Sequence, residues 1–192
     1  QGNFENAIGY LDSALSYDKT FIQTHLAKAK AQVEIGKINR ALESFKIITE
    51  LEPSLGEPFF YLGYLRIKDK KDSSAKDLIS EAIEKGYKKS QAYYYRGLLN
   101  LMDSKYPEAI ADFTEVIFLK PNHALAYHNR ATAKRELGDL QGALRDYTLA
   151  TDYKHDFPVA FNNLGSVKIL LGNYTGAIED YSVAINLDST FY

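Results

Sequence analysis

Hydrophobic residues recur along this chain at a constant interval of 34 positions. The interval is clearest for alanine, which holds the same place in six segments: Ala7, Ala41, Ala75, Ala109, Ala143 and Ala177. An equal spacing without insertion or deletion requires every segment to make the same step in space. The pattern therefore predicts a stack of similar units, not a compact globular core.

Each segment carries two stretches with helical spacing. After Ala177, for example, a large residue follows at Tyr181 and a compact one at Ala184, and these offsets fall on one helix face. A second apolar stretch lies upstream of each complete segment and opens with an aromatic residue: His25, Phe59, Tyr93, Tyr127 and Phe161. We therefore predict a first and a second helix in each repeat.

Glycine and proline mark the predicted helix ends. The turn between the two helices carries glycine in four segments, Gly2, Gly36, Gly138 and Gly172, and another residue in two, Lys70 and Ser104. Glycine just past a helix end adopts the left-handed backbone without a Cβ clash. All five prolines lie after or at the start of a predicted helix: Pro53, Pro58, Pro107, Pro121 and Pro158.

This set of residues resembles the tetratricopeptide repeat, a helix-turn-helix of 34 residues. The last repeat fits it best, at Phe161, Leu164, Gly165, Gly172, Asn173, Tyr174, Ala177, Tyr181 and Ala184. The repeat around Ala75 departs from it, because Asp72 stands where an aromatic residue is expected. The resemblance covers the whole chain and implies an all-α fold, an α-solenoid of stacked antiparallel helix pairs in a right-handed superhelix.

The phase of the repeat predicts a single array over residues 1–192. Full repeats are predicted at 22–55, 56–89, 90–123, 124–157 and 158–191, after a partial repeat at 1–21 that supplies only a turn and a second helix. Solenoids need polar caps at their ends, so we expect a piece of a longer protein. Uncovered apolar residues, such as Leu11 and Leu187, would favour end-to-end self-association.

Composition narrows the chemistry. The 192 residues are 45% hydrophobic and 25% charged with a net charge of −2, and no apolar run is long enough to span a bilayer. This charge argues against a nucleic-acid partner, which normally requires a basic surface. The first helices are mildly basic and the second acidic, which we interpret as solvated surface. Cytoplasmic localisation is favoured over periplasmic.

No residue pattern indicates catalysis or a metal site. Cysteine is absent, and the histidines lie in different repeats without the spacing of metal ligands: His25, His123, His128 and His155. We therefore predict neither a cofactor nor enzymatic activity.

The family resemblance implies that the first helices line a concave groove for a peptide or helix of a protein partner. Carried over by position, the candidate ligand-binding residues are Phe60, Tyr64, Tyr94, Leu98, His128, Asn129, Asn162 and Asn163. The groove would have an aromatic centre and a polar C-terminal end. Asn129 and Asn163 stand where members of this family use asparagine to bind a ligand's backbone.

Three alternatives stay open at this point. The aromatic residues could pack against a neighbouring loop or a flanking domain. The chain could be the docking arm of a larger enzyme or of an envelope or secretion machine, and not a noncatalytic scaffold. Helical-repeat RNA binding is the third, although such repeats are normally basic.

Overall fold

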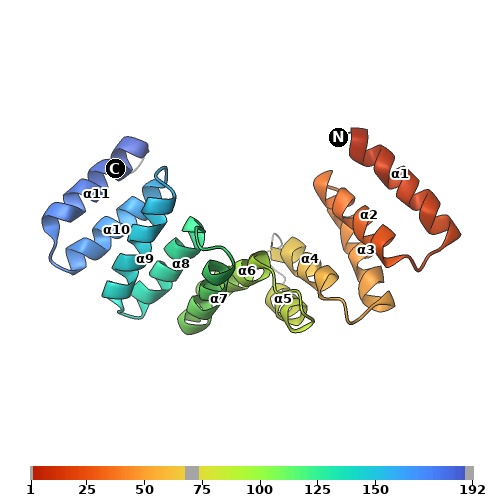
Figure 1. Cartoon of the computed structure of the whole chain (residues 1–192), viewed down its shortest axis with the longest axis horizontal. Helices are drawn as coiled ribbons and strands as arrows, with labels where there is room; N and C mark the ends of the chain where they lie inside the picture. The colour runs from red at the N-terminus through yellow and green to blue at the C-terminus, as the bar shows by residue number, and fades with distance from the viewer. Residues whose placement is uncertain (1, 68–73, 189–192) are drawn as a thin grey trace. The chain divides into compact units, whose positions relative to one another are not determined.

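A computed structural model describes residues 2–67 and 74–188, and all regular structure in these ranges is helical (Figure 1). Its helices are α1 (Gly2–Tyr17), α2 (Ile22–Glu34), α3 (Ile38–Leu51), α4 (Gly56–Ile67), α5 (Ala75–Glu84), α6 (Ser90–Met102), α7 (Tyr106–Leu119), α8 (Ala124–Glu136), α9 (Leu140–Tyr153), α10 (Pro158–Leu170) and α11 (Tyr174–Leu187). The all-α prediction is confirmed. Lys70 and Asp72 lie outside the described residues.

The chain forms two compact units, Gln1–Ala92 and Tyr93–Tyr192, with the boundary inside α6. We call them the N-terminal unit and the C-terminal unit and describe each by itself. Even-numbered helices are the first helices of the predicted repeats, and odd-numbered helices are the second. The single array over 1–192 stays a prediction.

The repeat frame is the buried face of the second helices. Five frame alanines are between 0% and 3% exposed: Ala41, Ala75, Ala109, Ala143 and Ala177. The large residue four positions later is fully buried in four helices: Phe45, Ile79, Phe113 and Tyr147. Small side chains let the paired helix approach, and the large ones fill the space beside them.

The turns between paired helices have the left-handed backbone that the sequence predicts, and the exception is Gly2. Gly36, Gly138 and Gly172 have φ of 74°, 82° and 79°, and Ser104 adopts the same left-handed backbone at 58° although it has a Cβ. The prediction of a turn at Gly2 is wrong, because α1 begins there.

In the N-terminal unit, aromatic and aliphatic packing joins consecutive helices. Phe45 of α3 is fully buried and packs in one cluster with Leu26 of α2 and Leu62 of α4. Its ring stacks on Tyr61 with the centroids 4.8 Å apart and the planes 3° from parallel. Gly63 of α4 lies so close to α5 that a Cβ there would be 2.8 Å from the Ala75 carbonyl oxygen.

In the C-terminal unit, the core between α8, α9 and α10 is built on Tyr147. This ring is fully buried among Ala131, Leu164 and Val167, and its hydroxyl lies 2.9 Å from Thr132 Oγ1. The same hydroxyl pair recurs one repeat later. No helix in the described ranges has the length and apolar character needed to cross a membrane.

Candidate functional site

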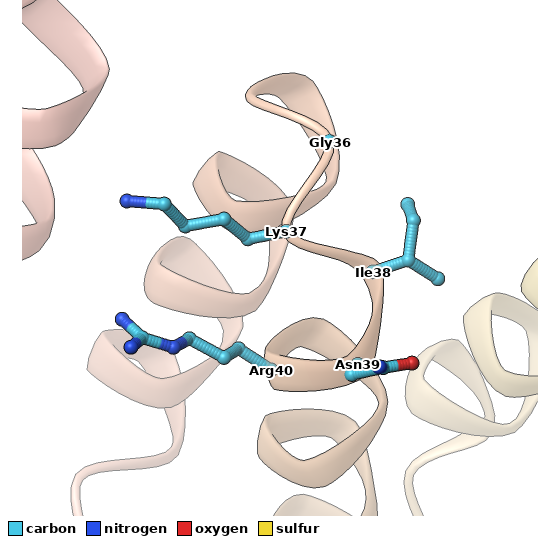
Figure 2. Close-up of a pocket in the computed structure, with 5 residues that line it drawn as sticks. All are labelled: Gly36, Lys37, Ile38, Asn39 and Arg40. Atoms are coloured by element: carbon cyan, nitrogen blue, oxygen red, sulfur yellow. The ribbon is translucent and has the colours of Figure 1, made fainter.

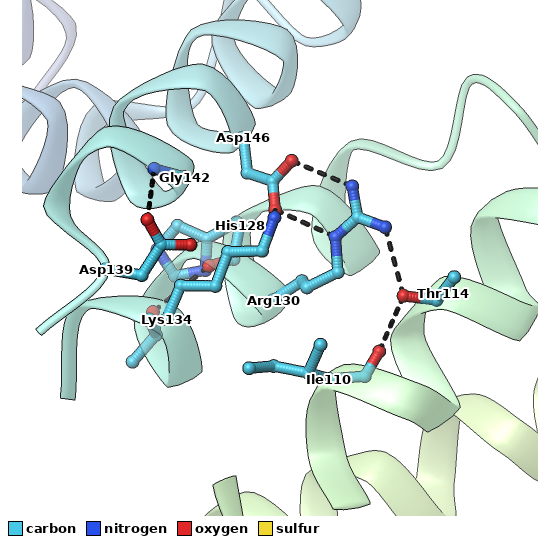
Figure 3. Close-up of polar contacts among 9 residues, drawn as sticks. Ile110, Thr114, His128, Arg130, Lys134, Asp139, Gly142 and Asp146 are labelled. Atoms are coloured by element: carbon cyan, nitrogen blue, oxygen red, sulfur yellow. Dashed lines mark hydrogen bonds and ion pairs between the residues drawn. The ribbon is translucent and has the colours of Figure 1, made fainter. Parts of the chain in front are cut away.

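Charged clamps join the two helices of each repeat in the C-terminal unit. Asp146 of α9 is 4% exposed and accepts hydrogen bonds from Arg130 Nε and Lys134 Nζ, both at 2.8 Å (Figure 3). The same position in neighbouring repeats is also an aspartate that binds a first-helix cation, in the pairs Arg96–Asp112 and Lys168–Asp180, each at 2.6 Å. Burial raises the pKa of Asp180, and the Lys168 ammonium opposes this shift.

These clamps change the interpretation of charge. The charge pattern predicts solvated basic residues on the first helices, but four cations of the C-terminal unit are engaged with carboxylates on their own second helices. Arg135 is paired as well, with Glu136 at 2.8 Å. The first-helix surface therefore offers a ligand little net charge. The signal was visible in sequence, because Asp112, Asp146 and Asp180 are one repeat apart.

Four of the predicted site residues form one hydrogen-bonded row in the C-terminal unit. Asn163 Nδ2 of α10 lies 3.0 Å from His128 Nε2 of α8, and His128 Nδ1 lies 3.2 Å from Asn129 Oδ1. Asn129 Nδ2 then donates to Tyr94 Oη of α6 at 3.3 Å. We call Tyr94, His128, Asn129 and Asn163 the polar row. Three successive first helices thus contribute to one continuous set of polar groups.

Aromatic contacts hold the ends of the row in place. The Tyr94 ring lies against His123, with centroids 5.2 Å apart, and against Phe113 at 6.0 Å. His123 is itself fixed because its Nδ1 accepts a hydrogen bond from Ala126 N at the start of α8. His128 contacts the ring of Phe157 at 5.0 Å. Residues His123 and Phe157 were not among the predicted site residues, although they are 34 positions apart and share a repeated position with Phe21 and Leu55, which is a signal that could have found them.

Burial sets the protonation of the row. It raises the pKa of Tyr94, opposed by the hydrogen bond from Asn129. It also lowers the pKa of His128, an effect that the hydrogen bond with Asn129 opposes and the Arg135 charge reinforces. Both side chains are therefore held neutral near pH 7, where they act as hydrogen-bonding groups without charge.

The remaining predicted residues do not join the row. Asn162 and Leu98 are half-buried in the C-terminal unit, and the Asn162 main-chain oxygen accepts a bond from Ser166. Phe60 and Tyr64 belong to the N-terminal unit and stack on each other, with centroids 6.0 Å apart. Phe60 is only 4% exposed, so the expectation that it offers open aromatic surface is wrong. It is covered in part by Tyr87, whose ring lies 5.0 Å away.

A surface depression of about 350 Å³ lies at the start of α3, and Lys37 and Arg40 are among the residues that line it (Figure 2). Lys37 Nζ is already bound to Glu5 at 3.1 Å, and none of the predicted site residues lines this depression. The described residues contain no cluster of three histidine, aspartate or glutamate side chains that could hold a metal ion.

Comparison with protein families agrees with the repeat geometry. A family model described as tetratricopeptide repeat matches residues 68–124 and 128–190, which is more than half of the chain. The chain belongs to the tetratricopeptide repeat family. A search of curated proteins returned no significant match.

Solved structures share the fold at low sequence identity. YrrB, described as a TPR protein with an unusual peptide-binding site, superposes with a TM-score of 0.86 at 19% identity, over 94% of this chain and 93% of YrrB. A MamA structure has a TM-score of 0.76 at 18% identity, over 88% and 92% of the two chains. MamA from Desulfovibrio magneticus gives 0.77 at 17% identity, over 88% and 96%. These similarities establish the α-solenoid fold.

Proposed function

We propose that this chain is a noncatalytic protein-interaction scaffold that binds a peptide segment of a partner on the first helices of the C-terminal unit. The polar row is the observation that carries the proposal. It joins α6, α8 and α10 by neutral amide, imidazole and hydroxyl groups that are half-buried and still reach the surface.

The open hydrogen-bonding capacity of the row suits a peptide backbone. Each primary amide has two donors and an acceptor with two lone pairs, and the contacts within the row use only part of that capacity. Asn129 and Asn163 can thus address the alternating N–H and C=O groups of an extended segment. YrrB, with the same fold, is described as having a peptide-binding site.

Charge and packing define the partner further. The cations of α6, α8 and α10 are engaged by Asp112, Asp146 and Asp180, so the surface does not select an acidic segment. Tyr94 and the half-buried Leu98 add apolar surface beside the row. We therefore expect the partner segment to be largely uncharged and to carry one apolar anchor residue. Buried anchors of this kind usually contribute most of the binding energy.

The test is a comparison of two double variants for binding to a peptide selected from a random library on the intact chain. Asn129→Ala with Asn163→Ala removes the two amides and should weaken binding about tenfold, because each lost hydrogen bond costs roughly 0.5–1.5 kcal/mol. The control, Glu115→Ala with Glu179→Ala, changes exposed second-helix residues of the same unit and should have no effect. Equal affinity of both variants, with helicity intact, refutes this site.

A further inference from the structure

The ring of His128 lies where four elements meet. Tyr147 of α9 approaches it edge-on at 5.4 Å and Phe157 of the loop before α10 at 5.0 Å. Asn163 of α10 and Asn129 of α8 contact its two nitrogens, and Asn129 links it to Tyr94 of α6. The charged or titratable groups that face the ring are Arg135 on its own helix, Tyr147, and Tyr94 through Asn129.

The hydrogen bonds around a neutral imidazole have a fixed direction. One ring nitrogen carries a proton and donates, while the other accepts. Here Nδ1–H donates to Asn129 Oδ1 at 3.2 Å, and Nε2 accepts from Asn163 Nδ2 at 3.0 Å. The row therefore runs in one direction, from Asn163 through His128 and Asn129 to Tyr94.

This direction leaves one atom of Asn163 available. Its Nδ2 is turned toward His128, and its Oδ1 accepts no hydrogen bond from the residues that the structure describes. We infer that neutral His128 is a specificity-determining residue: it fixes the Asn163 amide so that Oδ1 accepts a hydrogen bond from a main-chain N–H of the bound segment. This inference rests on the proposed peptide-binding function.

Protonation of His128 would reverse the polarity of this one contact. The charged ring carries a proton on Nε2 as well, which would face the N–H₂ group of Asn163. Asn163 would have to rotate its amide, turning Oδ1 to the ring and N–H₂ to the ligand. Asn129 would not rotate, because Nδ1–H donates to it in both charge states. The ligand's N–H would then face a hydrogen-bond donor at Asn163 of α10. The other contacts between the ligand and the row would stay favourable.

The first experiment reads the row without a ligand. Nitrogen-15 NMR of the intact chain should show His128 protonated on Nδ1 at neutral pH, and the side-chain amide signals of Asn163 should shift as His128 titrates. In His128→Gln, a neutral side chain, the Asn163 signals should not respond to pH. A proton on Nε2 at neutral pH overturns the inference, as do Asn163 signals that stay constant while His128 titrates.

The second experiment measures recognition with a probe that does not titrate. A capped peptide without acidic residues or histidine is selected from a random library at about pH 7.5, and its affinity is measured again at about pH 5. We expect the wild-type chain to bind about tenfold more weakly in acid, the cost of one mismatched hydrogen bond, and His128→Gln to lose most of this pH dependence. His155→Gln removes an exposed histidine of the same unit and should behave like the wild type.

The outcomes separate the two proposals. If binding depends on Asn129 and Asn163 but His128→Gln keeps the acid loss, the role of His128 is refuted and the peptide site stands. If no selected peptide responds to substitution of these asparagines, the peptide site itself is refuted, and the inference falls with it.

Discussion

The two units use the same repeat position in different ways. In four repeats a first-helix residue contacts the second-helix residue twelve positions later. In the N-terminal unit this pair is Gln32 with Ser44, a neutral hydrogen bond of 2.9 Å between buried side chains, and in the next repeat the second-helix place is the apolar Leu78. In the C-terminal unit the second-helix residue is always aspartate, and its partners twelve positions earlier are Asn100, Lys134 and Lys168.

Helix capping differs in the same sense. The N-cap residues of α2, α3 and α5 in the N-terminal unit make no side-chain cap bond. In the C-terminal unit His123, Asp139 and Asn173 cap α8, α9 and α11 by accepting a main-chain N–H, whereas the N-cap residues of α7 and α10 make no side-chain cap bond. Both units have apolar and aromatic cores, and the C-terminal unit adds a polar version of the contact between paired helices, the buried aspartate clamps. The polar version depends on both partners, because a buried charge left alone is costly.

The largest expected effect is the loss of a clamp aspartate. Asp146→Ala leaves Arg130 and Lys134 partly buried without their anion, and should lower the free energy of unfolding by about 3 kcal/mol. Ser44→Ala, the equivalent change in the N-terminal unit, should cost about 1 kcal/mol, because it breaks a neutral bond. Hydrogen exchange of α9 and α3 would measure the two losses locally.

Asp152→Ala is the matched control, since it removes an exposed carboxylate from the same helix as Asp146. It should leave the exchange of α9 within experimental error of the wild type. If Asp146→Ala and Ser44→Ala prove equally destabilising, the charged and neutral pairs do not differ in the way that we describe.

The next effect concerns the closeness of the paired helices. Gly63→Ala should destabilise the N-terminal unit by about 2 kcal/mol, because the new methyl group meets the Ala75 carbonyl oxygen at 2.8 Å and backbone cannot move aside cheaply. At Gly165 of α10, the equivalent place in the C-terminal unit, a Cβ would lie 3.1 Å from the edge of the Tyr181 ring and 3.2 Å from the Ala177 carbonyl oxygen, both farther than the Ala75 oxygen at Gly63. Since alanine is the better helix former by about 1 kcal/mol, Gly165→Ala should be close to neutral.

Thermal unfolding of the two glycine variants decides this point. Ala131 fills the corresponding place in α8 and shows that a methyl group is tolerated there. A larger loss for Gly165→Ala than for Gly63→Ala would mean that the shorter contacts at Gly63 do not set the cost of a methyl group at this place.

The fold could be predicted from the sequence because the same helical pattern recurs in every repeat. Ala109 and Phe113 are a weak helical pattern alone, but their equivalents recur every 34 residues and are buried as expected, except that Ala7, Leu11 and Tyr181 are partly buried. Ser104 in the left-handed region shows the strength of this signal, because its turn was placed by the repeat and not by its own preference. At Gly2 the repeat predicts a turn, and the structure has the first residue of α1 there instead.

The site was harder to predict. The place of a residue in the repeat indicates which helix it belongs to, but not which groups its side chain contacts. Asn129, Asn163 and His128 were rightly placed on the first helices, yet their bonds to one another depend on rotamers and on packing between repeats. Phe60 was misjudged for the same reason, since its partner Tyr87 comes from a loop without a repeat signal. The charged clamps could have been found, because both partners follow the interval.

The smallest expected effect is a pH dependence confined to the C-terminal unit. His123 caps α8 with Nδ1 as acceptor, and burial lowers its pKa below the ordinary value of 6.5. The unfolded chain therefore binds a proton more readily than the folded one, so stability is full above about pH 6.5 and falls as the pH drops below it.

His123→Asn keeps a capping acceptor and removes the titration. The melting temperatures of the wild type and this variant should agree at neutral pH and separate in acid, with the wild type lower by the equivalent of at most about 1 kcal/mol, the usual value of a cap. His155→Gln, on the exposed loop before α10, should follow the wild-type curve. Parallel curves for the wild type and His123→Asn down to about pH 5 would show that the cap does not contribute to the difference between the units.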